Sequence, residues 1–195
     1  MAKGTSLSLP SSQFPAGPLV LDASVLFNLL GTGKPKEILQ AIGVTCWVEQ
    51  RTAAEVRRMP GQRTEGAPLQ PLFDDGCLKL CRMSDQAYEI YISLVSGLPT
   101  DTLDDGESAA IAIAADGFGS VVLDDKKARR ILSARFKQSS PASSLTLLLA
   151  AATRANWTLD ELRAAVTAAR TVSRMAVVPD ERPLFSELFA AAASD

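Results

Sequence analysis

The chain has 195 residues, 47% of them hydrophobic, which suits one α/β domain with a core of its own. Its 20 basic and 22 acidic residues give a net charge of −2, so the protein is not coated in positive charge for nucleic acid, although a local basic patch remains compatible with this balance. The chain contains no histidine, which excludes Ser-His-Asp triads, Cys-His pairs, imidazole general bases and zinc sites with imidazole ligands.

Short apolar runs alternate with helical segments along the chain. Residues 1–17, rich in Ser, Pro and Gly, are expected to form a flexible tail, and residues 18–195 a single domain. In order, we expect a strand at 18–22, helices at 23–30 and 35–42, a strand at 44–48, a helix at 49–59, a loop at 60–76, a strand at 77–83, helices at 85–95 and 104–115, a strand at 121–123, helices at 126–136, 145–155 and 159–171, an extended piece at 175–178 and a helix at 184–191.

Strands that alternate with helices are typical of α/β proteins. We therefore expect a three-layer α/β/α sandwich around a central, mostly parallel sheet. No apolar segment approaches the roughly 18 residues that a membrane span requires. The first 17 residues also lack an apolar core of signal-peptide length. The protein is accordingly expected to be cytoplasmic and not to bind membranes.

The three cysteines, Cys46, Cys77 and Cys81, complete no zinc site. We expect them to be buried free thiols of a protein in a reducing compartment.

Near the C-terminus, an apolar stripe at helical spacing comprises Leu184, Phe185, Leu188 and Phe189. Packing against the core is the favoured use of this stripe, and an interface with a partner is the alternative.

Carboxylates follow two of the apolar runs directly. Asp22 ends the first predicted strand, and Asp124 and Asp125 end the strand at 121–123. Ligands of open parallel sheets lie beyond the carboxyl ends of the strands, where the strand order reverses. The usual reason to keep such a cluster of acids is a divalent cation. The alternative is helix capping, because each acid also stands at the start of a predicted helix.

Two helix-borne acids are further candidates. Glu55 lies on the helix that follows the second strand, and Glu107 lies in the first turn of the helix at 104–115. Glu55 has a second interpretation as a solvated residue beside Arg58. Glu107 has one as part of a capping arrangement with Asp104.

Together these segments resemble the PIN-domain family of metal-dependent ribonucleases, in particular a bacterial and archaeal branch related to the VapC-type toxins. The similar segments are LVLDAS at 19–24, WV at 47–48 with AEV at 54–56, DGESAAIAIA at 105–114, and VVLDDKKARR at 121–130. The resemblance covers about residues 18–155. The loop at 60–76 and the N-terminal tail depart from the family pattern.

The resemblance implies an endoribonuclease that uses Mg²⁺ or Mn²⁺ to cleave RNA phosphodiester bonds. It assigns Asp22, Glu55, Glu107 and Asp125 to catalysis, and Asp22, Glu107, Asp124 and Asp125 to the metal. Glu49 remains a substitute for Glu55, since that part of the match rests on spacing. The resemblance also implies a homodimer and, if the protein is a toxin, a cognate antitoxin.

Two residues near Asp22 on the following helix, Ser24 and Asn28, are candidates for orienting the metal ligands. For Ser24, helix capping is about equally favoured.

A basic run without acids follows the Asp pair. We expect it to hold RNA phosphates beside the metal or, equally, to be a solvated helix face. Its members are Lys126, Lys127, Arg129, Arg130, Arg135 and Lys137.

The sequence is also compatible with two other functional hypotheses. A catalytically inactive PIN-like module would bind a protein or RNA partner without cleaving it. A different metal-dependent phosphotransfer fold fits less well, because the haloacid-dehalogenase type requires an aspartate where Ser24 stands, and a receiver domain has its acids in the reverse order.

Overall fold

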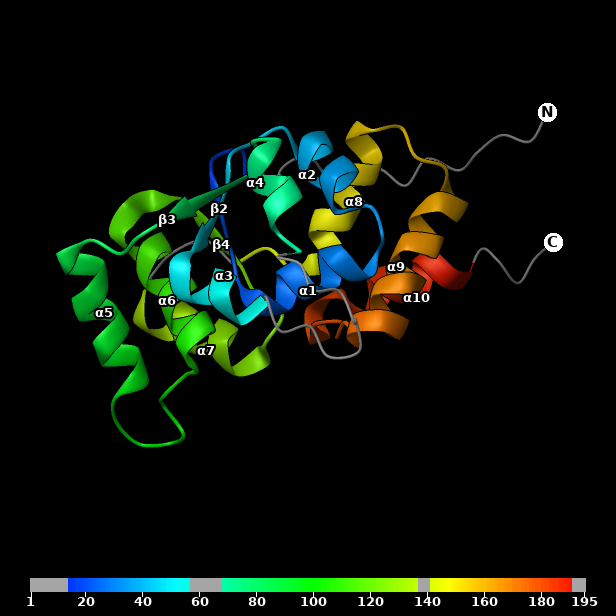
Figure 1. The fold of residues 1–195 in the computed structure, drawn as a ribbon. Helices are drawn as coiled ribbons and strands as arrows, with labels where there is room; N and C mark the ends of the chain where they lie inside the picture. The colour runs from blue at the N-terminus through cyan, green and yellow to red at the C-terminus, as the bar shows by residue number, and fades with distance from the viewer. Residues whose placement is uncertain (1–13, 57–67, 137–140, 191–195) are drawn as a thin grey trace, which may run out of the picture.

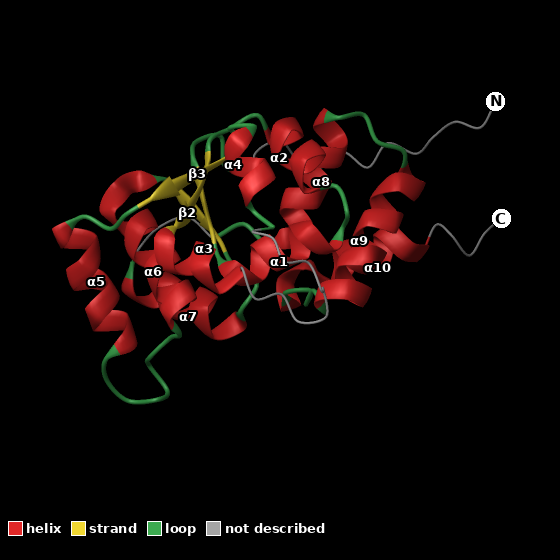
Figure 2. Cartoon of the chain, in the orientation of Figure 1, coloured by secondary structure: helices red, strands yellow, loops and turns green. Residues whose placement is uncertain are grey.

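Four parallel strands form the centre of the protein (Figures 1 and 2). A computed structural model describes residues 14–56, 68–136 and 141–190. In this part of the chain the sheet order is β3-β2-β1-β4. The strands are β1 (Leu19–Leu21), β2 (Cys46–Glu49), β3 (Leu78–Cys81) and β4 (Ser120–Val122). The predicted α/β/α class with a parallel sheet is confirmed.

Helices cover the sheet on both faces, with α5, α6 and α7 on one side and α2, α8 and α9 on the other (Figure 1). Their bounds are α1 (Ala23–Gly31), α2 (Pro35–Ile42), α3 (Gln50–Val56), α4 (Gln70–Asp74), α5 (Asp85–Val95), α6 (Asp105–Ile113), α7 (Lys126–Arg135), α8 (Ser144–Arg154), α9 (Leu159–Ser173) and α10 (Arg182–Ala190), with a π-helical turn η1 (Ala114–Phe118) and a 3₁₀ turn η2 (Pro179–Glu181).

Side-chain alternation along β1 explains the three layers. Leu19 and Leu21 belong to the buried cluster that α1, α2, α8 and α9 build on one face, whereas Val20 belongs to the cluster of α6 and α7 on the other. Successive side chains of a strand point to opposite faces, so a strand covered on both sides is apolar throughout. All three residues of β1 are fully buried.

The strand order places a topological switch at β1. The chain adds β2 and β3 on one side of β1 and then returns to add β4 on the other side. Leu21 pairs with Val122, so both strands point their carboxyl ends toward the same edge of the sheet. A crevice for a ligand is expected there, between the residues that follow β1 and β4.

The predicted loop at 60–76 is wrong over residues 70–74, which form α4. Three prolines and three glycines in that stretch argued for a loop. Leu69 and Leu72 are nevertheless buried against the core, and Pro71 lies in the first helical turn, where its missing N–H is not needed. Residues 57–67 lie outside the described part of the chain.

Other element boundaries differ by one or two residues. Glu49, expected to start a helix, is the last residue of β2, and α3 begins at Gln50. The last helix begins at Arg182, two residues earlier than predicted. Of the expected N-terminal tail, residues 1–13 are not described, and the guanidinium of Arg154 lies 5.6 Å from the ring of Phe14.

The C-terminal apolar stripe packs on the core. Leu188 is fully buried, and Leu184, Phe185 and Phe189 are half-buried against the cluster under α8 and α9. The rings of Phe185 and Phe189 lie 4.8 Å apart. The structure therefore favours the predicted core role over the predicted partner interface.

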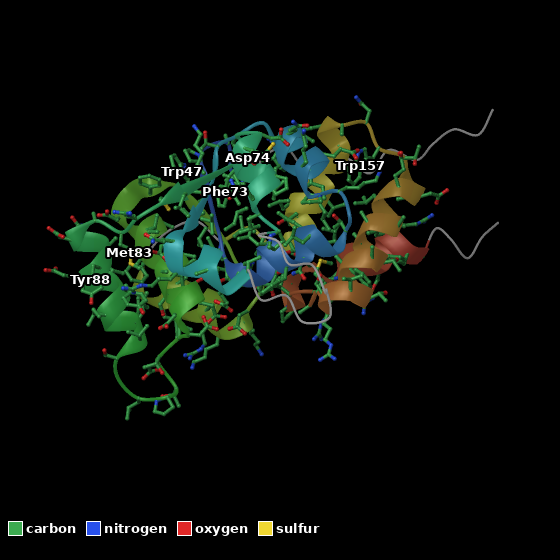
Figure 3. All side chains as sticks on the ribbon, viewed as in Figure 1. Trp47, Phe73, Asp74, Met83, Tyr88 and Trp157 are labelled. Atoms are coloured by element: carbon green, nitrogen blue, oxygen red, sulfur yellow. The ribbon has the colours of Figure 1, made fainter. Side chains whose placement is uncertain are left out.

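Trp157, which follows α8, connects this end of α8 to α2 (Figure 3). Its indole N–H donates to Glu37 Oε1 at 2.6 Å, and Lys34 lies 5.0 Å from the ring.

All three cysteines are free, with Cys46 and Cys81 buried and Cys77 half-buried. Among the described residues, no helix is both long and apolar enough to cross a membrane.

A close contact joins α1 to α9 at Gly31. A Cβ placed on Gly31 would meet Ser173 Oγ at 2.0 Å and Ser173 Cβ at 3.2 Å. Ser173 Oγ in turn donates to the carbonyl of Phe27 at 2.7 Å. Glycine is required here because the backbone of α1 lies directly against α9.

We expect Gly31→Ala to lower the free energy of unfolding by about 1–3 kcal/mol, because the added methyl group overpacks this contact. Urea denaturation measures the change. Gly17→Ala is the matched control, because a Cβ at Gly17 meets nothing within 4 Å. Equal stability of the two variants would contradict the close contact.

Candidate active site

Asp22 is the buried acid at the carboxyl end of β1. It also caps α1, with Oδ2 accepting hydrogen bonds from the backbone N–H of Ser24 at 3.2 Å and from Ser24 Oγ at 2.6 Å. Only 3% of the residue is exposed. Burial raises the pKa of Asp22 to about 6, with the nearby charge of Asp104 adding to the effect. Capping occupies Oδ2, and a backbone hydrogen bond from Ala23 also lowers the pKa of this carboxylate, while Oδ1 lies beside Gly106.

Glu107 is an acid with a strongly raised pKa. It lies in the first turn of α6, where Asp104 caps the helix by accepting from the Glu107 backbone N–H at 2.9 Å. Burial, together with the charges of Asp104, Asp125 and Asp22, raises the pKa of Glu107 to about 8. Three segments of the chain therefore bring their acids close enough to repel one another.

Glu55 reaches this cluster from α3, across Gly106. A Cβ on Gly106 would lie 3.1 Å from Glu55 Oε2 and 3.3 Å from Asp22 Oδ1. Glu55 Oε2 and Asp22 Oδ1 thus lie beside the same glycine. The distance between these two oxygens is at most the sum of the two distances given above. Partial burial and the charges of Asp104 and Asp105 raise the pKa of Glu55. The absence of a side chain at Gly106 makes room for both acids.

Glu49, the predicted substitute for Glu55, serves a different purpose. It is buried at the end of β2, and its Oε2 accepts from the backbone N–H groups of Arg51 and Thr52, the latter at 3.4 Å. These bonds hold the start of α3. The geometry therefore favours Glu55 over Glu49 as the acid that α3 contributes.

Asp124, after β4, is fully enclosed by protein donors. Its Oδ1 accepts from the backbone N–H of Ser144 at 2.8 Å, and its Oδ2 accepts from Ser144 Oγ at 2.6 Å and from Asn28 Nδ2 at 2.7 Å. Burial raises its pKa, while these hydrogen bonds lower it. Asp124 links α1, β4 and the start of α8, so capping and support account for both of its oxygens.

Asp125 is exposed and caps α7, with Oδ1 accepting from the backbone N–H of Ala128 at 2.8 Å. The charge of Asp125 contributes to the raised pKa of Glu107.

Ser24 and Asn28, the predicted orienting residues, bind Asp22 and Asp124 respectively. The sequence did not identify Ser144, which contacts Asp124 across 20 residues of chain.

Most of the basic run is engaged with backbone carbonyls. Lys127 Nζ donates to Pro99 O at 2.7 Å, and Arg130 donates to Thr100 O at 3.0 Å. Arg129 donates to Leu123 O and Ala142 O, and Arg135 to Ser93. These contacts favour a structural role for much of α7. Lys137 lies outside the described residues, and Lys126 lines a cleft beside the acids.

That cleft has a volume of about 830 Å³. Its acidic side carries Glu107, Asp124 and Asp125, and α1 contributes Ser24, Phe27 and Asn28. The remaining lining, a segment that we call the C-terminal wall, consists of residues 172–179 and Arg182. Glu107 and the two acids that follow β4 thus border a hollow large enough for part of a substrate, while Asp22 and Glu55 are not among its lining residues.

The donor set fits a hard divalent cation, which prefers carboxylate oxygens. Within the described residues, Asp22, Glu55 and Glu107 form no ion pair with Lys or Arg. In the same residues, no group of three acids or cysteines has the spacing of a metal site. Repulsion between uncompensated carboxylates keeps the acids apart when no cation is bound. The side chains of Glu55 and Glu107 are flexible, so a bound cation could draw these two carboxylates toward Asp22.

A comparison with known families decides the identity of the domain. A family model described as a PIN domain matches residues 18–171, which is most of the chain. The chain belongs to the PIN-domain family. PIN domains are generally nucleases, hydrolases that typically use divalent metals. No curated protein and no solved structure gives a match to the chain.

The electrostatics of this PIN domain predict how its stability depends on pH without metal. The pKa of Glu107 is about 8 in the folded state against an ordinary value of 4.5. Between these values only the folded state holds the proton, so stability should fall as pH rises through this window. In EDTA, we expect Tm to drop by at least about 3 °C between pH 5 and pH 8.

Glu107→Gln should flatten this profile above pH 6 and raise Tm at pH 8, because glutamine is neutral in both states. Asp22, whose pKa is about 6, keeps the slope at lower pH. Glu89→Gln, on the exposed surface of α5, is the control. A wild-type Tm that rises from pH 5 to pH 8 would show that Glu107 is not destabilised as its surroundings indicate.

Proposed function

We propose that this PIN domain is a metal-dependent endoribonuclease that cleaves RNA phosphodiester bonds. The observation that carries the proposal is the position of Asp22 and Glu55 over Gly106, with Glu107 in the same helical turn. Three segments distant in sequence supply these acids, and helix capping accounts for only part of their oxygens. Such a cluster is costly unless it binds a cation.

Asp22, Glu107 and Asp125 would hold Mg²⁺ or Mn²⁺, with Glu55 and Asp124 binding directly or through water. The bound ion would supply a hydroxide nucleophile at neutral pH and offset charge on the scissile phosphate. Because Asp124 already accepts three hydrogen bonds, it suits a role in fixing the site better than direct ligation. Glu107 must lose its proton before it binds a cation.

The surrounding residues orient this set. Ser24 holds Oδ2 of Asp22, which turns Oδ1 toward Glu55 and Gly106. Asn28 and Ser144 fix Asp124 at the bottom of the cleft. Lys126, which directly follows Asp125 and lines the cleft, is placed to contact an RNA phosphate.

The biological setting of the nuclease is also part of the proposal. The segments at 105–114 and 121–130 resemble the branch related to VapC-type toxins, so we include a toxin role with a cognate antitoxin, a homodimer and a cytoplasmic location. A small DNA-binding protein encoded next to this chain would support the toxin role.

The second candidate is a catalytically inactive PIN-like module that binds a protein or RNA partner. Two observations favour it: protein donors occupy both oxygens of Asp124, and no three acids of the described residues are grouped closely enough to hold a metal ion. Calorimetric titration with Mn²⁺ separates the two candidates. Absence of binding at millimolar concentration would favour the module.

The decisive test is cleavage of RNA with Mn²⁺. We expect the wild-type protein to cleave, EDTA to abolish cleavage, and Asp22→Asn or Glu107→Gln to reduce the rate at least about 100-fold, because each substitution removes a ligand charge. Gly106→Ala should also reduce the rate, since its methyl group would crowd Glu55 and Asp22.

Glu89→Gln, which changes an exposed acid on α5, should cleave at the wild-type rate. Cleavage that persists in EDTA, or an unimpaired Asp22→Asn variant, would rule out this site as the source of the activity.

A further inference from the structure

One wall of the cleft comes from a different part of the chain than the acids do. Residues 172–179, which end α9 and lead into η2, line this wall together with Arg182 at the start of α10. The family match ends at residue 171, so the wall lies just beyond it. It brings two guanidinium groups, those of Arg174 and Arg182, to a hollow bordered by carboxylates.

Both arginines are free to bind a ligand. Each is exposed, and neither guanidinium has a hydrogen bond or an ion pair with any residue in the described ranges. They differ in this respect from Arg129, Arg130 and Arg135 on α7, which donate to backbone carbonyls. The wall therefore carries positive charge that the protein itself does not neutralise.

The backbone at Arg174 decides which substitution tests its side chain. Arg174 caps the end of α9 with φ of 59° and ψ of 35°, the left-handed conformation in which glycine is the usual residue. A side chain in this conformation is destabilising. Substitution by glycine therefore removes the guanidinium without straining the backbone.

The rest of the wall is apolar. Val172 is 55% exposed, Val177 is half-buried, and Met175 and Val178 are buried beneath them, while Phe27 of α1 lines the same hollow. A surface that combines apolar contacts with unpaired guanidinium groups suits a nucleotide, which has an apolar base face and a charged phosphate.

We propose that residues 172–182 form an RNA-binding wall, in which Arg174 and Arg182 contact phosphates of the strand that passes the acidic cluster. The proposal rests on the proposed nuclease function and adds to it the residues that position the substrate. With Lys126 on the other side of the cleft, the wall balances the charges of Glu107, Asp124 and Asp125. An acidic segment of a protein partner is the competing occupant.

The test compares two substitutions at left-handed residues. Arg174→Gly removes the guanidinium and relieves the backbone, so it should raise Tm by about 2 °C while weakening RNA binding. Asn156→Gly is the matched control, because Asn156, with φ of 54°, lies before the opposite end of α9. It should leave RNA binding unchanged.

Binding is measured by fluorescence anisotropy with a labelled single-stranded oligoribonucleotide in EDTA, where cleavage does not interfere. We expect Arg174→Gly to raise Kd about fivefold and to reduce the slope of log K against log salt by about 0.7. Arg174→Lys should keep most of that slope. Lys36→Gln, which removes one positive charge from the exposed surface of α2, should have little effect.

The outcomes separate this inference from the proposed function. If the wild-type protein cleaves RNA and Arg174→Gly and Arg182→Gln bind and cleave normally, the wall is not an RNA contact, and a protein partner becomes the better occupant. If Arg174→Gly weakens RNA binding but the wild-type protein does not cleave, the wall stands and the nuclease assignment fails. A Tm that falls in Arg174→Gly with RNA binding unchanged would show a purely structural role.

Discussion

Repulsion among carboxylates at the carboxyl ends of β1 and β4 is the constraint around which this domain is organised. The parallel sheet has its switch point at β1, and that topology alone brings Asp22 beside the residues that follow β4. Helices α3 and α6 then add Glu55 and Glu107 to the same region. Burial, with the neighbouring charges adding to it, raises the pKa values of Asp22 and Glu107, so keeping these acids ionised in the folded protein has a cost.

The protein relieves this repulsion in two ways. Asp124 is compensated by donors of its own chain, so its charge is stabilised whether or not a ligand is present. Asp22, Glu55 and Glu107 receive fewer donors and, in the described residues, no cation. A cation bound to these acids would remove a destabilisation already present in the folded state. The division also separates acids that fix the site from acids that are available to a ligand.

The sequence predicted the layers and the acids better than it predicted the connections between them. Apolar runs such as residues 19–21 identify buried strands because both faces of the sheet are covered. Helix α4 was missed because its single buried face is short and its composition is that of a loop. Ser144 was missed because its bond to Asp124 crosses 20 residues, and no local pattern encodes such a contact. Spacing left Glu49 and Glu55 unresolved, and the backbone bonds of Glu49 separated them.

The contact between α1 and α9 has a consequence beyond stability. Both helices line the cleft, α1 with Ser24, Phe27 and Asn28 and α9 with Val172 and Ser173. Ser173 bonds the carbonyl of Phe27, and Gly31 allows the helices to meet without an intervening side chain. Backbone contact at Gly31 therefore fixes the spacing between these lining residues. A larger residue at position 31 would displace them together with the helices, so a change at the far end of α1 would alter the shape of the cleft.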